Sequence, residues 1–144
     1  MDIYSYLKKD HKKVNSLFKQ IINTKNTRSR KKLFQVVKQE LLLHAKAEQA
    51  TFYKALENND KSSEKVEHAI DEHSEIKKLL NKIDKIQINK DQWLVDFGVL
   101  KYQVEHHVKE EEGELFDKAK KILDSEQANE LVQKIEEYKQ RNHQ

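Results

Sequence analysis

Residues 106–116 read HHVKEEEGELF and contain a histidine and a glutamate four positions apart, His107 and Glu111. An earlier stretch, HAKAEQATFY, holds His44 and Glu48 at the same spacing. Residues four apart are neighbours on the surface of an α-helix and project in the same direction. Each pair can therefore present an imidazole nitrogen and a carboxylate oxygen to one metal ion, which needs both atoms within about 2 Å.

Each of these pairs is preceded by a further histidine at nearly the same distance. His11 lies 33 residues before His44, and His73 lies 34 residues before His107. Both upstream histidines directly follow a carboxylate, in the stretches KKDHKKV and IDEHSEI. The chain therefore contains one unit, H…HxxxE, that is used twice.

Length and composition favour an all-α protein. The chain has 144 residues with no proline and two glycines, so residues that break helices are nearly absent. The absence of cysteine excludes disulfides, zinc–thiolate sites, iron–sulfur clusters and cysteine nucleophiles. The 28 basic and 25 acidic residues are mixed along the chain, so we expect no nucleic-acid partner. No apolar run approaches about 20 residues and no secretory signal is visible, so we expect a cytoplasmic protein that is not bound to a membrane.

Apolar residues that recur every three or four positions predict five helices. Their expected bounds are residues 2–23, 29–57, 63–86, 90–123 and 125–141. Four long helices with short connections favour an antiparallel up-down-up-down four-helix bundle over residues 1–123, followed by the short C-terminal helix. We expect a single domain over residues 1–144. Because the two histidines of each unit are equally far from the turn between their helices, all four histidines should lie at one level of the bundle.

The repeated unit predicts a dinuclear transition-metal site. Neutral imidazole suits iron, zinc and copper, and a glutamate can bridge two ions through its two oxygens. A buried carboxylate without a partner is costly, which argues against a core without metal. Six protein ligands would leave positions for a bridging oxygen and for a small exogenous molecule. The predicted ligands are His11, His44, Glu48, His73, His107 and Glu111.

Two other pairs have the same spacing but a different helical phase. His68 and Glu72 share a face with charged residues, and His106 and Glu110 lie about 100° from the apolar stripe of their helix. We predict that these two histidines, and His143 near the C-terminus, are surface residues.

Three further residues lie close to the predicted ligands in sequence. Asp10 and Glu72 are one position off the ligand face, and we expect exposed carboxylates there rather than acceptors for a neighbouring imidazole N–H. Tyr53 follows Glu48 by five residues, and the sequence leaves open whether it belongs to the core or places its phenol near the metals.

Several other kinds of site are absent from the sequence. The Glu-x-x-His spacing of ferritin-like di-iron proteins does not occur, and HExxH is missing. There is also no glycine-rich phosphate loop and no serine nucleophile elbow.

The double pattern, in DHKKV, HAKAEQATFY, EHSEI and HHVKEEEGELF, resembles the hemerythrin-like family, the HHE cation-binding domain, over about residues 1–123. The resemblance implies a non-haem di-iron site with the six residues above as ligands and an oxo or hydroxo bridge between two iron ions. One departure is Lys77, where oxygen-carrying hemerythrins usually have a further histidine. Others are Lys54 and Asp117, where the family often has proline.

From this resemblance we expect a protein that binds or reacts with O₂, NO or peroxide at an open iron position. The sequence does not define the oligomeric state, and a monomer is the default. One alternative is a di-iron enzyme with catalase-like or ferroxidase-like activity. Another is a helical interaction module without metal.

Overall fold

The computed structural model describes residues 1–143, and every regular element in this range is a helix. The elements are α1 (Ile3–Asn23), α2 (Thr27–Glu48), η1 (Gln49–Tyr53), α3 (Lys54–Leu56), α4 (Ser63–Asp84), α5 (Asp91–Glu110), η2 (Glu111–Leu115), α6 (Phe116–Lys120) and α7 (Ser125–Asn142). The η1 and η2 segments are π-helical turns within two of the long helices. The predicted set of four long helices and one C-terminal helix is thus confirmed.

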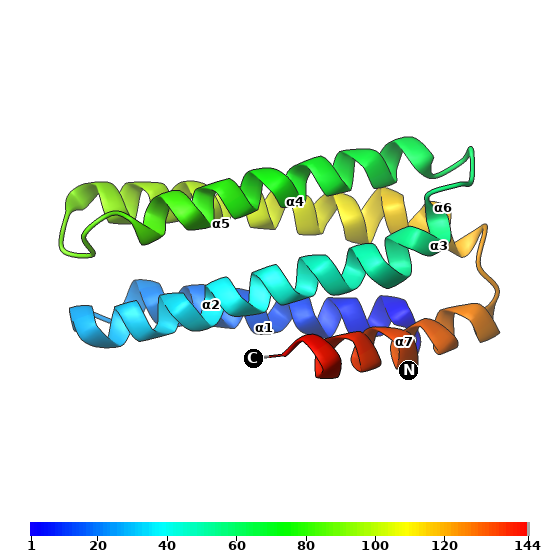
Figure 1. Cartoon of the computed structure of the whole chain (residues 1–144). Helices are drawn as coiled ribbons and strands as arrows, with labels where there is room; N and C mark the ends of the chain where they lie inside the picture. Colours follow the sequence, from blue (N-terminus) through cyan, green and yellow to red (C-terminus); the bar gives the residue numbers. More distant parts are fainter. Residues whose placement is uncertain (144) are drawn as a thin grey trace.

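The four long helices run up and down in two hairpins that lie side by side (Figure 1). The first hairpin is formed by α1 and α2, and the second by α4 and α5. Helix α7 folds back along the first hairpin and contacts both of its helices. Within the described part of the chain, no helix is long and apolar enough to cross a membrane.

Polar side chains fix three of the helix starts. The carboxylate of Asp2 accepts a hydrogen bond from the backbone N–H of Ser5 at 2.9 Å and so caps α1. Asp124 forms a capping box with Gln127 at the start of α7. Helix α2 begins two residues before its predicted start, because Asn26 caps it through the N–H of Ser29.

The apolar core consists of two clusters, one toward each end of the bundle. The first cluster includes Leu7, Phe52, Phe116 and residues of α7, and the second includes Phe18 and Phe97. On each of the four long helices a histidine of the repeated unit lies between the two clusters. A buried polar layer therefore crosses the middle of the bundle.

The two π-helical turns lie next to this polar layer. In a π-helix the backbone hydrogen bonds join residues five apart, so the turn is wider than in an α-helix. The wider turn at η1 keeps Tyr53 on the same face as Glu48, although five residues separate them. The second unit has Phe116 at the equivalent place, following η2. Apolar periodicity alone does not reveal these turns.

The aromatic cluster far from the polar layer provides a test of the fold. Phe97 is 1% exposed, stacks on Trp93 and meets Phe18 and Phe34 edge to face. We expect Phe97→Ala to lower the free energy of unfolding by about 3–5 kcal/mol in urea titrations, because it leaves a cavity. The control Val95→Ala changes an exposed side chain of the same helix and should stay within about 0.5 kcal/mol of the wild type.

Candidate metal centre

All six predicted ligands converge in the polar layer. His11 comes from α1, His44 and Glu48 from the end of α2, His73 from α4 and His107 from α5. Glu111 opens the π-helical turn η2. All six side chains are buried, and the carboxylates most of all, with Glu48 0% and Glu111 2% exposed. Residues that are far apart in sequence are thus brought within reach of common points.

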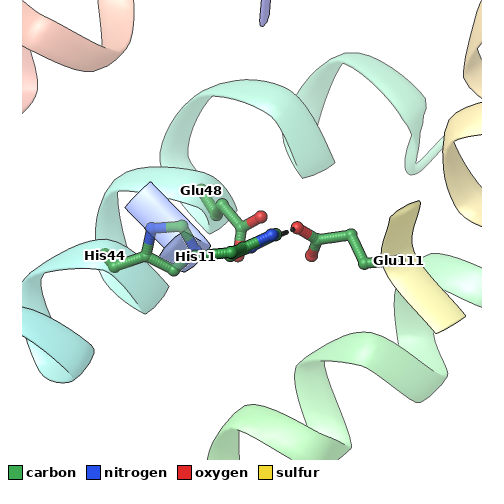
Figure 2. A group of neighbouring side chains, drawn as sticks. All are labelled: His11, His44, Glu48 and Glu111. Carbon is green, nitrogen blue, oxygen red and sulfur yellow. Dashed lines mark ion pairs between the residues drawn. The ribbon is translucent and has the colours of Figure 1, made fainter. Parts of the chain in front are cut away.

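The first of two groups joins the two hairpins (Figure 2). His44 Nε2 lies 3.2 Å from Oε1 of Glu48, one turn further along the same helix. His11 Nε2 lies 3.2 Å from Oε1 of Glu111, across the bundle. One ligand atom from each of these four residues lies within 4.8 Å of the others, so they can surround one ion.

The second group uses the same two carboxylates with the other two histidines. His73 Nε2 lies 3.2 Å from Oε1 of Glu48, and His107 Nε2 lies 3.4 Å from Oε2 of Glu111. The two Nε2 atoms are 3.1 Å apart. Because Glu48 and Glu111 belong to both groups, the geometry suits two neighbouring ions that share two carboxylates.

The inward nitrogen and oxygen atoms have the spacing that a metal requires, and several of them have no other partner within residues 1–143. Two ligand atoms at about 2.0–2.1 Å from one ion are about 3.0–3.4 Å apart at ordinary coordination angles, as observed here. Four buried atoms of the centre have no hydrogen-bond partner among the described residues, although groups this deep normally have one. They are His11 Nε2, His44 Nε2, Glu48 Oε2 and Glu111 Oε1. The donor set therefore fits a transition-metal centre.

The outward nitrogens of two histidines are held by the carboxylates that precede the upstream histidines. His44 Nδ1 contacts Asp10 at 3.0 Å, and His107 Nδ1 contacts Glu72 at 2.8 Å. Our expectation that Asp10 and Glu72 would be exposed was wrong. Helical phase describes only a residue's own helix, whereas both acceptors reach a histidine on the neighbouring one.

The other two histidines are held by residues that sequence reasoning missed. His73 Nδ1 contacts the amide oxygen of Gln49 at 2.9 Å, and His11 Nδ1 contacts Glu112 at 2.6 Å. Gln49 and Glu112 directly follow Glu48 and Glu111, so the repeat itself contains this signal. With every Nδ1–H donated outward, each neutral imidazole keeps its Nε2 lone pair for the centre.

Tyr53 places its phenol inside the centre, which resolves the question that the sequence left open. Its side chain is fully buried, and its O–H donates a hydrogen bond to Glu111 Oε2. The phenol oxygen of Tyr53 also lies 3.3 Å from Glu48 Oε1, so Tyr53 contacts both shared carboxylates. Burial and the two carboxylates raise the pKa of Tyr53 well above its usual value, so the phenol keeps its proton.

The buried histidines and carboxylates of the centre shift one another's pKa values. Burial lowers the pKa of His44 and His107, but the nearby carboxylates outweigh burial and raise both to about 10. Burial raises the pKa of Glu111, whereas its contacts with Glu48, His107 and His11 hold it well below its usual range. Metal binding here must therefore displace protons, because a coordinating imidazole is neutral.

The three histidines assigned to the surface lie there. His68 and His106 have side chains 55% and 51% exposed, and His143 is exposed as well. Lys54 and Asp117, which stand where the family often has proline, are exposed, and their helices continue past them.

A cavity of about 30 Å³ adjoins the centre, lined by all four histidines. Its other walls are almost entirely apolar, and Lys77 is the one lysine among the described residues that line it. The apolar wall consists of Val14, Leu41, Leu42, Ala45, Ile76, Leu80, Val104 and Val108. The centre is therefore bordered by a small space with mostly apolar walls.

Comparison with known proteins agrees with this geometry. Residues 2–119 match the family described as the hemerythrin HHE cation binding domain, so the chain belongs to that family. A hemerythrin HHE cation binding domain-containing protein from Mycobacterium kansasii has the same fold, with a TM-score of 0.82 at 21% identity over 99% of this chain and 94% of that one. A protein described as a DNA nickase from Nostoc sp. is 29% identical over 127 residues, 88% of this chain. The chain spans 36% of that protein's length.

The outer acceptors provide a test of the centre. We expect Asp10→Ala to weaken the affinity for Zn²⁺, measured by competition with a chelator, about 10–100-fold, because His44 loses the group that orients it. Asp117→Ala removes an exposed carboxylate from α6 and should leave the affinity unchanged. Equal affinities of the two variants would show that the Asp10 contact does not support metal binding.

Proposed function

We propose that this chain is a non-haem di-iron protein that binds or reacts with O₂, NO or peroxide. The observation that carries the proposal is the sharing of Glu48 and Glu111 between two histidine groups. Each group then has two imidazoles and two carboxylate oxygens, a mixed donor set that suits iron. His11, His44, Glu48, His73, His107 and Glu111 would hold the two ions.

Iron at this centre would supply exchangeable ligand positions and one-electron redox chemistry. The chain's own residues would determine what reaches those positions. The adjoining cavity has room for about two water molecules, judged by the 10–15 Å³ that one water needs, so it suits a diatomic molecule or peroxide. Tyr53 would hold both shared carboxylates in place and offers a proton donor within the same layer.

The relative from Nostoc sp. is named for a different activity, the nicking of DNA. The match covers about a third of that protein, so its DNA-directed activity can belong to the remainder. The absence of a nucleic-acid partner stays a prediction, based on the mixed charges of the chain.

Metal content tests the ligand set. Protein purified in air should contain about two iron ions per chain, and Glu48→Ala or Glu111→Ala should contain fewer, because each carboxylate belongs to both groups. The matched control is Glu67→Ala, an exposed carboxylate of α4. Full iron content in both variants would show that the ligand set is wrong. A wild type that takes up no metal, even after anaerobic loading, would favour the helical module instead.

Filling the cavity tests the identity of the ligand. Val104 is buried and lines the cavity, and we expect Val104→Phe to slow the reactions with O₂, NO and peroxide in stopped-flow experiments while iron content is retained. Its cost in stability should be about 1–3 kcal/mol. The control is Val99→Phe, which adds the same ring at an exposed position of α5. Equal rates in both variants would exclude this cavity as the binding space.

The reaction of the iron-loaded wild type with peroxide separates a carrier or sensor from an enzyme. Steady oxygen evolution from peroxide by the iron-loaded protein, lost in His107→Ala, would assign catalase-like turnover. A single stoichiometric spectral change would assign ligand binding.

A further inference from the structure

The two surface pairs meet each other on the outside of the second hairpin. His68 and Glu72 are one turn apart on α4, and His106 and Glu110 are one turn apart on α5. Helices α4 and α5 lie side by side (Figure 1). We call these four residues the outer cluster. It repeats the histidine–glutamate spacing of the buried centre at a different helical phase.

Contacts across the two helices bring His68, Glu72 and Glu110 to the spacing of a metal site and place His106 beside Glu110. His68 Nε2 lies 3.1 Å from Glu110 Oε2 and 3.5 Å from Glu72 Oε2. His106 Nε2 lies 2.8 Å from Glu110 Oε1 and 3.9 Å from Glu72 Oε2. Ligand atoms of His68, Glu72 and Glu110 lie within 4.8 Å of one another. Two imidazoles and two carboxylates form a donor set that divalent transition metals prefer.

Further negative charge borders the outer cluster. A surface groove lined by His68, His106 and Glu72 also has Asp71 and Glu75 in its walls. A groove lined by negative charge raises the local concentration of cations and the rate at which they arrive. The surface of α4 and α5 is therefore suited to capturing a cation from solution.

Glu72 connects the outer cluster to the buried centre. Its Oε2 faces the two surface histidines, whereas its Oε1 accepts a hydrogen bond from His107 Nδ1 at 2.8 Å. The side chain of His107 in turn contributes Nε2 to the buried centre. The carboxylate of Glu72 thus contacts both the histidines of the outer cluster and His107 of the centre.

A narrow crevice follows the same direction. Its outer wall includes His68, Glu72 and Glu110, and its inner wall includes His107 and Glu111. Glu111 is almost fully buried and its Oε1 has no hydrogen-bond partner among the described residues. The crevice therefore places ligand atoms of the outer cluster and of the centre in the walls of one space, which Lys65, Ala69 and Leu115 also line.

We propose that His68, Glu72, His106 and Glu110 form a second, peripheral site for a divalent transition-metal ion, and that this site loads the buried centre through the crevice. The loading role rests on the proposed function, because it requires a buried centre that binds metal. The peripheral site itself does not, since none of its four ligands is among the six residues that would hold metal in the centre.

The rate of metal uptake tests the loading role. Metal-free protein is mixed anaerobically with a limiting amount of Fe²⁺, and iron that resists a fast surface chelator is measured over time. We expect H68N/H106N to take up iron about tenfold more slowly or worse, because capture at the surface is lost. Its final iron content should equal that of the wild type. The control H143N removes an exposed histidine far along the chain and should load at the wild-type rate.

Uptake by H68N/H106N at the wild-type rate would overturn the loading role. Thermal unfolding of the metal-free variants checks that the substitutions have not altered the fold, and no change is expected because both histidines are half exposed.

Equilibrium binding tests the peripheral site separately. In dialysis against Co²⁺, the wild type should bind one ion more than H68N/H106N, with H143N equal to the wild type. If the buried centre binds no metal, the wild type should bind one ion and the double variant none, so failure of the proposed function remains distinguishable. Equal Co²⁺ content in the wild type and the double variant would overturn the peripheral site.

Discussion

Two carboxylates buried among four imidazoles are the feature on which the rest of the molecule depends. An ionised carboxylate in an apolar core is stable only when it is paired, hydrogen-bonded or bound to a metal. Glu48 and Glu111 lie at the centre of the bundle, and the four histidines, Tyr53 and the outer acceptors are arranged around them. The apolar clusters on either side close the ends of this layer and keep water out.

The two halves of the centre follow one rule of connection. In each unit, the residue before the upstream histidine holds the downstream histidine of the same unit, as Asp10 holds His44. The residue after the glutamate holds the upstream histidine of the other unit, as Glu112 holds His11. The orienting contacts therefore link both hairpins, so neither unit forms its half of the centre alone.

The sequence was sufficient to predict the helices and the six central residues, because periodicity and spacing within a helix are local properties. It was insufficient wherever a contact crosses between helices. Asp10 was expected to be exposed because its phase on α1 is off the core, yet its partner His44 belongs to α2. Tyr53 could not be assigned because a π-helical turn changes the phase after Glu48. The meeting of His68 with Glu110 depends on the register between α4 and α5, which no single helix encodes.

Helix α7 adds a contact that the internal repeat does not provide. Lys139 donates a hydrogen bond to Oδ2 of Asp10, the same oxygen that His44 contacts. Burial raises the pKa of Asp10, but its bonds to His44 and Lys139 lower it to about 2. The equivalent acceptor, Glu72, faces histidines instead of a permanent cation. A duplicated sequence thus yields electrostatically unequal halves: the imidazole of His44 shares its counter-charge with an ammonium group, whereas that of His107 does not.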